Sequence, residues 1–578
     1  MATADTRVAP APSRTEAVSR RGKWATAGVV VAIAVAFLLP LRYLLRAPAP
    51  TMEEGILLVF PERVLHGDVP HRDFLHLYGP GSLWVLAAFF KAFGTRIEVE
   101  RVVALAQLVG LSAAVALLLR LWGRWVALAG GVLTVLFTLP SLLLTAWPWL
   151  GGAALGLGAV VALLQTRADD AQPDRSRVAG RWAVTGGVLA GVALLYRIDL
   201  GLAVLLAGAA VVWGLRARLV RRAVVGAAIG LSPYLVHVAI AGPSNVWSSM
   251  IVDPLFRLRP TRGLPVPPDP TQLKGTAVTA LIDERSWPLP KLPLSGQLFA
   301  WFVGVVAVVL FLLAVGVWRM RRNPGALRSR ALLAAALFSA GVLPQAIQRA
   351  DATHLGWVSA IAVAVLPAAI VEVVSALRPR WSGARLGLAA GASVLVATAL
   401  LLPGYTARRY AGFVQDSLRG TAGSITIHHD GRTYYLGDAP DEAANIRHLL
   451  DAADRAGHRG DRLVVGTGDL RRTPYVDSFL YYMLPKYEPG TYFIEMEPGI
   501  TNRNGTELTG DLRRADVVVL ADRWLNWREP NDSMKPGDPR PNEVLRNEFC
   551  ETGRFGGFHL LVRCSPRATT RFEPATNR

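Results

Sequence analysis

The first 403 residues are dominated by apolar runs, whereas the rest of the chain alternates between short apolar and polar stretches. A helix that crosses a membrane needs roughly 20 mainly apolar residues. Eleven runs approach this length, namely 24–45, 98–119, 125–141, 145–165, 183–196, 199–215, 223–241, 298–318, 331–347, 355–374 and 385–403. The pattern predicts a polytopic α-helical membrane protein with about 11 transmembrane helices.

Residues 404–578 have the pattern of a separate α/β domain. Strands are expected at 461–469, 491–496, 515–522 and 558–564, and helices at 440–457, 474–484 and 507–514. Because apolar strands alternate with helical stretches, we expect parallel strands joined by helical crossovers.

Composition and charge support this division. The chain has 578 residues, of which 52% are hydrophobic and only 18% charged, against about 25% charged in a typical soluble domain. Residues 404–578 hold 24 basic and 24 acidic side chains, so the whole net charge of +19 lies in residues 1–403. These numbers exclude a disordered chain, a collagen and a disulfide scaffold. The long apolar runs make membrane lipid an expected partner. The basic residues form no single stripe, which argues against binding to nucleic acid.

The basic residues also predict an orientation. Alternate connections, counted with the N-terminal tail, carry 23 basic and five acidic side chains, and such connections face the cytoplasm. We therefore expect a cytoplasmic tail at 1–23, a transmembrane domain at 24–403 and an extracytoplasmic domain at 404–578, in the plasma (inner) membrane. Outer loops are then expected at 46–97 and 242–297.

Two segments of the outer loops are less regular. Gly81–Phe93 is apolar but short, and Lys91 interrupts it, so we interpret it as an interfacial or re-entrant helix rather than a span. The loop 242–297 is rich in proline, which favours an ordered coil over a helix.

Both cysteines, Cys550 and Cys564, fall in the predicted outer domain. In an oxidising compartment two cysteines suggest a disulfide, and Gly553 and Gly556-Gly557 between them would let two strands lie side by side. The alternative is a pair of unrelated buried thiols.

Ionisable residues gather at three places on the predicted outer face. The first outer loop begins with the acidic pair Glu53-Glu54 and continues to PHRDFLHLYGPG at 70–81; the others are Tyr196–Asp199 and Gln345–His354. A carboxylate there could accept a proton from an attacking hydroxyl, and arginine and histidine could neutralise a phosphate. Alternatively, the glutamates cap a helix and the arginines form structural ion pairs.

The order of features in this loop resembles a known family. After the first span and the acidic pair come R-V-L-x-G-x-x-P-x-R-D-F at 63–74, Y-G-P-G at 78–81, a short apolar helix and Arg101. This order resembles the GT-C superfamily of membrane glycosyltransferases, in particular bacterial relatives of protein O-mannosyltransferases and aminoarabinose transferases.

The resemblance implies an enzyme that moves a sugar from a polyprenyl-phosphate donor to an envelope glycan, lipid or protein on the outer face, with inversion. It makes Glu53 the catalytic base and Glu54 its partner, although the family's pair is more often Asp-Asp or Asp-Glu. The residues expected to bind the donor phosphate and sugar are Arg197, Asp199, Arg349, Asp351 and His354. The residues expected to shape the acceptor pocket are His71, Arg72, Asp73 and Tyr78.

Two rival functions remain open. A polysaccharide polymerase or ligase also uses outer arginine and histidine groups, and a lipid or glycan transporter would place charges near the bilayer midplane. No nucleotide-binding glycine motif is present and no histidine has companions at metal-ligand spacing. The sequence thus identifies no cofactor, and a divalent metal ion stays an alternative without a supporting motif.

The orientation is directly testable. A reporter enzyme fused after residue 410 should be active only outside the cytoplasm, because the excess of basic residues fixes the alternate connections inside. A fusion after residue 380 serves as the control with the opposite expected result. Cytoplasmic activity of the first fusion would overturn both the topology and an outer site.

Overall fold

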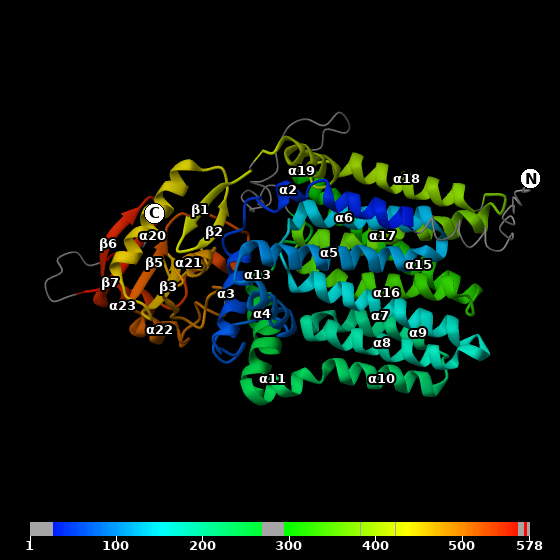
Figure 1. Ribbon diagram of the computed structural model, residues 1–578, viewed down its shortest axis with the longest axis horizontal. Coiled ribbons are helices and arrows are strands. Elements are labelled where there is room, and N and C mark those ends of the chain that lie inside the picture. The colour runs from blue at the N-terminus through cyan, green and yellow to red at the C-terminus, as the bar shows by residue number, and fades with distance from the viewer. Residues whose placement is uncertain (1–26, 269–293, 382, 422, 565–571, 575–578) are drawn as a thin grey trace, which may run out of the picture.

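The computed structural model describes residues 27–268, 294–381, 383–421, 423–564 and 572–574. A bundle of roughly parallel and antiparallel helices forms one part, and an α/β domain packs against one end of it (Figure 1). The helices of the bundle are α2 (Leu41–Leu44), α5 (Ile97–Leu119), α6 (Arg124–Leu142), α7 (Pro148–Asp170), α8 (Ser176–Tyr196), α9 (Gly201–Val212), α10 (Ala217–Leu231), α11 (Pro233–Ala241), α15 (Leu294–Arg322), α16 (Leu327–Gln348), α17 (Ala352–Leu377) and α18 (Ala384–Leu401).

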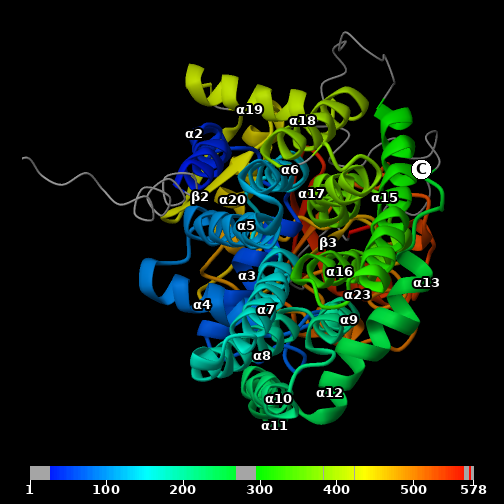
Figure 2. The same cartoon turned by 90° about the vertical axis from the view of Figure 1, so that its right-hand side faces the viewer.

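The bundle has the expected membrane-protein character. Within the described ranges, nine helices are long and apolar enough to cross a membrane, and they coincide with nine of the predicted runs. The runs 24–45 and 199–215 correspond to shorter apolar helices, Ala27–Leu38 and Ile198–Val212, and residues 24–26 lie outside the described residues. Viewed along the bundle, α10 and α11 lie at one edge and α18 at the opposite edge (Figure 2).

The first outer loop folds between the bundle and the α/β domain. It forms α3 (Glu53–Leu65) and α4 (Gly81–Phe93), and both lie at the end of the bundle that faces the α/β domain (Figure 1). The helix expected over Gly81–Phe93 is present with those bounds. Its depth relative to a bilayer stays a prediction.

The expectation of coil in the second outer loop is wrong for its first part. Residues 243–262 form α12 (Pro243–Trp247), a π-helical segment (Ser248–Leu258) and α13 (Arg259–Arg262). Pro243 and Pro260 occupy first turns, where a helix does not need the missing N–H. Residues 269–293 lie outside the described residues.

The α/β domain follows α19 (Ala407–Arg419) and is built on two sheets. Strands β1 (Ile425–His429) and β2 (Arg432–Leu436) form an antiparallel pair. The larger sheet has the order β4-β3-β5-β7-β6. Its strands are β3 (Arg462–Thr467), β4 (Glu488–Pro489), β5 (Val517–Ala521), β6 (Phe549–Phe555) and β7 (Phe558–Arg563), and its helices are α20 (Pro440–Ala456), α21 (Phe479–Met483), α22 (Leu508–Arg514) and α23 (Arg540–Glu548).

Three details of the predicted domain are corrected. The sheet is mixed, because β3 pairs in parallel with β4 and β5 whereas β5, β7 and β6 pair antiparallel. Residues 491–496 form no strand; they are irregular, and Asp511 accepts a hydrogen bond from the backbone of Tyr492 at 2.9 Å. The helix expected over 474–484 is confined to Phe479–Met483.

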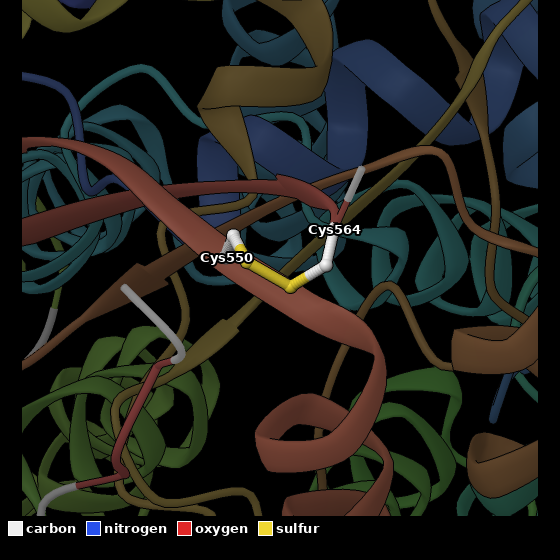
Figure 3. The surroundings of a disulfide bond; sticks show 2 residues. All are labelled: Cys550 and Cys564. Carbon is white, nitrogen blue, oxygen red and sulfur yellow. A yellow bond between two sulfur atoms is a disulfide. The ribbon is translucent and has the colours of Figure 1, made fainter. Parts of the chain in front are cut away.

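Cys550 and Cys564 form the disulfide that the sequence suggested (Figure 3). Cys550 lies on β6 and Cys564 directly follows β7, with Gly556 and Gly557 at the turn between the two strands. Their Cα atoms are 5.0 Å apart, within the range that a disulfide requires. The bond therefore closes the β6–β7 hairpin.

The predicted outer connections all meet at one end of the bundle. The backbone N–H of Leu75 donates a hydrogen bond to the carbonyl of Tyr492 at 2.8 Å, and the side-chain hydroxyl of Thr261 donates one to the carbonyl of Pro498 at 2.8 Å. At the other end, Arg328 bonds the carbonyl of Leu121 at 2.7 Å. Both long predicted outer loops therefore contact the α/β domain at the same end of the bundle; the number of crossings and which end is cytoplasmic stay predictions.

A buried ion pair fixes the first outer loop on the bundle. Arg101 donates through Nε and Nη2 to the two carboxylate oxygens of Glu54, at 2.6 and 3.0 Å, and both side chains are at most 2% exposed. The same guanidinium donates to the carbonyls of Leu44 and Ala47 at 3.2 and 2.9 Å. Arg101 thus joins α5, the start of α3 and the segment after α2.

Removing one member of this pair should destabilise the protein strongly. Glu54→Gln leaves the Arg101 charge buried without its counter-ion, which costs about 3–5 kcal/mol. Adding Arg101→Met should recover part of the loss, because no unpaired charge then remains. The measurement is thermal or denaturant unfolding of the purified protein. Arg72→Gln, which removes an exposed ion pair with Asp73, should change stability by about 1 kcal/mol or less, and equal losses in the two single variants would contradict the assignment.

Candidate active site

Two neighbouring cavities lie where the bundle meets the α/β domain. The larger, about 400 Å³, is lined by the ends of the bundle helices and by residues 250–262. The smaller, about 100 Å³, is lined mainly by residues of the α/β domain. Both cavities share five lining residues: Glu53, Arg262, Arg349, Asp351 and Thr353. The shared residues make this junction the candidate active site.

Glu53 lies at the junction, as the first residue of α3. The hydroxyl of Tyr475, from the α/β domain, donates a hydrogen bond to its carboxylate. Burial raises the pKa of Glu53, and the Tyr475 hydrogen bond and the charges of Arg262 and Arg349 act in the opposite direction without cancelling it. A carboxylate whose pKa is raised in this way is a better proton acceptor than one in water.

Arg197 follows the last residue of α8 and faces the larger cavity. Its Nε donates to Asp199 at 2.9 Å and its Nη2 donates to the same carboxylate at 2.5 Å. The guanidinium carbon lies 4.4 Å from the ring centre of Tyr78 and 5.4 Å from that of Trp357. Among the described residues, its Nη1 has no hydrogen-bond partner although it is buried. Arg197 thus keeps one donor for a ligand.

Arg349 occupies the matching position after α16. It donates to Asp351 at 2.9 Å and to Glu529 of the α/β domain at 2.6 Å. Asp351 also caps α17 by accepting from the backbone of His354 at 2.9 Å and contacts the His354 ring at 2.8 Å. Burial opposes ionisation of Asp351, but His354 and Arg349 outweigh it and keep its pKa below the usual range. The predicted Arg–Asp ion pairs therefore form, and they line the cavity as well.

Several residues of the site were missed by the sequence analysis. Arg262 pairs with Glu497, and Glu495 lies 3.8 Å from Arg262. Burial and the nearby Glu497 raise the pKa of Glu495 well above its usual range. The sequence predicted a strand at 491–496, which contains Glu495 and ends just before Glu497. Arg262 belongs to the loop that was expected to be coil. No pattern in the sequence links them to Glu53.

The structure separates other predicted residues from the junction. Glu54 is turned to Arg101 and lines neither cavity, so its assignment as the partner of the base is corrected to a structural role. Arg72 and Asp73 pair with each other at 2.8 Å and line a different cavity, of about 690 Å³. Neither shapes the pocket around Glu53, because the turn at 70–73 points them away from it.

His71 is also displaced from the pocket. It is buried, with its ring 2.7 Å from that of His237 and 3.0 Å from the carbonyl of Tyr78. Burial lowers the pKa of His71 well below its usual range and that of His76 to about 3, so both are neutral. These rings support the segment that carries Tyr78, the one predicted pocket residue of this group that lines the larger cavity.

Within the described residues, no group of three or more histidine, cysteine, aspartate or glutamate side chains is arranged to hold a metal ion. A divalent metal ion was an alternative without a supporting motif in the sequence, and the described residues of the site offer no candidate set of ligands for it.

Comparisons with known proteins find solved structures that are similar to this chain. The chain is similar to ArnT from Cupriavidus metallidurans bound to undecaprenyl phosphate, with 16% identity over 94% of this chain and 100% of that chain and a TM-score of 0.47. It is also similar to the oligosaccharyltransferase AglB from Archaeoglobus fulgidus, in complex with an inhibitory peptide and a dolichol-phosphate, with 12% identity over 93% and 74% of the two chains and a TM-score of 0.43.

No protein-family model matches the chain, and no curated protein matches it either. At their identities and TM-scores, the two structural neighbours support no conclusion about the residues of the site. The function of this chain therefore has to come from the site itself.

Proposed function

We propose that the chain is a membrane glycosyltransferase that moves one sugar from a polyprenyl-phosphate donor to a hydroxyl group on the outer face of the membrane, with inversion at the anomeric carbon. The observation that carries the proposal is the position of Glu53, whose carboxylate lies where the two cavities join. One cavity can hold a lipid-linked phosphate and the other a second substrate.

The larger cavity has the chemistry that a lipid phosphate needs. Its lining combines apolar side chains, such as Ile251, Leu255 and Leu258, with four arginines: Arg197, Arg259, Arg262 and Arg349. Arginine binds phosphate with paired hydrogen bonds, and the buried Nη1 of Arg197 still lacks a partner in the described part of the chain. The apolar lining accounts for the isoprenoid end of such a donor.

The proposed reaction gives each of these groups a role. The acceptor hydroxyl attacks the anomeric carbon as the bond from that carbon to the phosphate oxygen breaks. Glu53 takes the hydroxyl proton, and the lipid phosphate leaves with its bonding electron pair. Arg197 and Arg349 stabilise the negative charge that grows on the departing phosphate. Asp199 and Asp351 hold the two guanidiniums in place.

Glu53→Gln is the decisive variant. It preserves size but cannot take a proton, so transfer should fall by about 100- to 10,000-fold while the protein still folds and binds the donor. The measurement is single-turnover transfer from a panel of polyprenyl-phosphate sugars by the full-length protein in nanodiscs.

Asp73→Asn is the matched control for this measurement, since Asp73 is a first-loop carboxylate that lines another cavity. Its rate should stay within about threefold of the unsubstituted protein, as for a residue outside the reacting centre. Normal transfer by Glu53→Gln together with a large loss in Asp73→Asn would reject Glu53 as the base.

The pH profile should report the contact between Tyr475 and Glu53. A base works only when deprotonated, so kcat/KM should fall as the pH drops through the pKa of Glu53, which burial raises. The hydrogen bond from Tyr475 lowers that pKa; Tyr475→Phe removes it and should shift the acidic limb to higher pH. Tyr487→Phe, whose hydroxyl bonds the carbonyl of Ala453, should leave the limb unchanged. If the acidic limb of Tyr475→Phe is not shifted, Tyr475 does not hydrogen-bond the group that acts as the base.

A further inference from the structure

The smaller cavity contains two polar groups that have no partner. The hydroxyls of Thr473 and Ser533 are buried and, among the described residues, make no hydrogen bond, although both residues line this cavity. The backbone N–H of Thr473 donates to the carbonyl of Ser533 at 2.8 Å, so the two residues are held side by side. Buried hydroxyls are normally satisfied, so these two adjacent hydroxyls are available to hydrogen-bond a ligand that carries hydroxyl groups.

Aromatic side chains form one side of the same cavity. Tyr475 and Trp527 line it, with ring centres 6.3 Å apart, and Trp524 packs behind them at 4.5 Å from Tyr475 and 5.7 Å from Trp527. Such side chains offer an apolar face beside a polar edge. The C–H face of a sugar ring fits against an aromatic surface of this kind, while its hydroxyls reach the polar lining.

The charge of the cavity limits the ligand further. Four carboxylates line it: Glu53, Asp351, Glu497 and Glu529. Only two guanidiniums, Arg262 and Arg349, balance them, and both are already engaged in ion pairs with these carboxylates. A phosphate or carboxylate on the ligand would therefore meet repulsion here. The larger cavity is lined by four arginines and three carboxylates, so it is the more favourable of the two for an anion.

We propose that the smaller cavity is the acceptor subsite and that it binds the terminal, uncharged sugar ring of an envelope glycan. This inference rests on the proposed function and narrows its acceptor from any hydroxyl to a neutral glycan end. The cavity volume of about 100 Å³ leaves no room for a segment longer than one ring. The ring would stack on Trp527, hydrogen-bond Thr473 and Ser533, and present one hydroxyl to Glu53.

The test is direct binding to the full-length protein in nanodiscs, which needs no donor. The probes are neutral arabino-, manno-, galacto- and gluco-oligosaccharides, a uronic-acid oligosaccharide of the same length and a Ser/Thr-rich peptide. At least one neutral oligosaccharide should bind saturably, and the uronic-acid oligosaccharide and peptide should not. Binding of the peptide or of the uronate in preference to every neutral glycan would overturn the inference, and so would the absence of neutral glycan binding.

Variants then locate the binding site. Ser533→Ala should weaken binding of the neutral glycan by about tenfold, and Trp527→Ala should weaken it by about 30-fold or more. Trp381→Ala is the matched control, because Trp381 is exposed and lies at the connection between α17 and α18. Trp527→Phe should restore part of the affinity if the ring stacks, which separates lost stacking from misfolding. If neither Ser533→Ala nor Trp527→Ala changes the affinity for the glycan, the glycan binds at another site.

Deoxy analogues of the glycan that binds provide the sharpest readout. Removing the ring hydroxyl that reaches Ser533 should weaken binding to the unsubstituted protein but not to Ser533→Ala, because the contact is already lost. Additive losses for every deoxy position would contradict the contact. Polyprenyl-phosphate binding is measured in the same nanodiscs: its absence counts against the proposed function, whereas its presence without glycan binding counts against this inference alone.

Discussion

The buried pair of Arg101 and Glu54 is the constraint on which the site depends. A guanidinium removed from water needs a complete set of acceptors, and here they come from Glu54 and from the carbonyls of Leu44 and Ala47. Two separate segments, residues 44–47 and the start of α3, are therefore fixed at one point of α5. Glu53, the residue before Glu54, is positioned by this contact and faces the cavities instead of the arginine.

The α/β domain holds α3 from the opposite side. The backbone N–H of Phe479 donates to the carbonyl of Thr51 at 3.0 Å, and Gly55 permits the close approach, since a Cβ there would come within 2.5 Å of the Phe479 nitrogen. Tyr475 and Glu529 then reach Glu53 and Arg349. In this arrangement the domain is part of the site rather than an appendage, because it contributes most of the lining of the smaller cavity.

The two adjoining cavities differ in the charge of their lining, and this difference assigns the donor and the acceptor of the proposed reaction to different cavities. The arginines at the ends of α8 and α16 favour a lipid phosphate, whereas the carboxylates near Tyr475 disfavour any anion. Electrostatic repulsion of the wrong partner contributes to specificity as much as attraction of the right one. A donor and an acceptor would thus approach Glu53 from different sides, with the proton acceptor already between them.

The sequence by itself determined the apolar helices, the disulfide and the grouping of Glu53, Arg197 and Arg349 at one end of the bundle, because hydrophobic runs, the connections between them and cysteine count are local signals. Only the tertiary structure decided which of two adjacent glutamates faces the cavity, since a helix turns neighbouring side chains about 100° apart. It also decided that Asp73 lies elsewhere and that Tyr475, Glu497 and Glu529 belong to the site. These residues lie more than 400 positions from Glu53, and their meeting depends on how two domains pack, which no local pattern encodes.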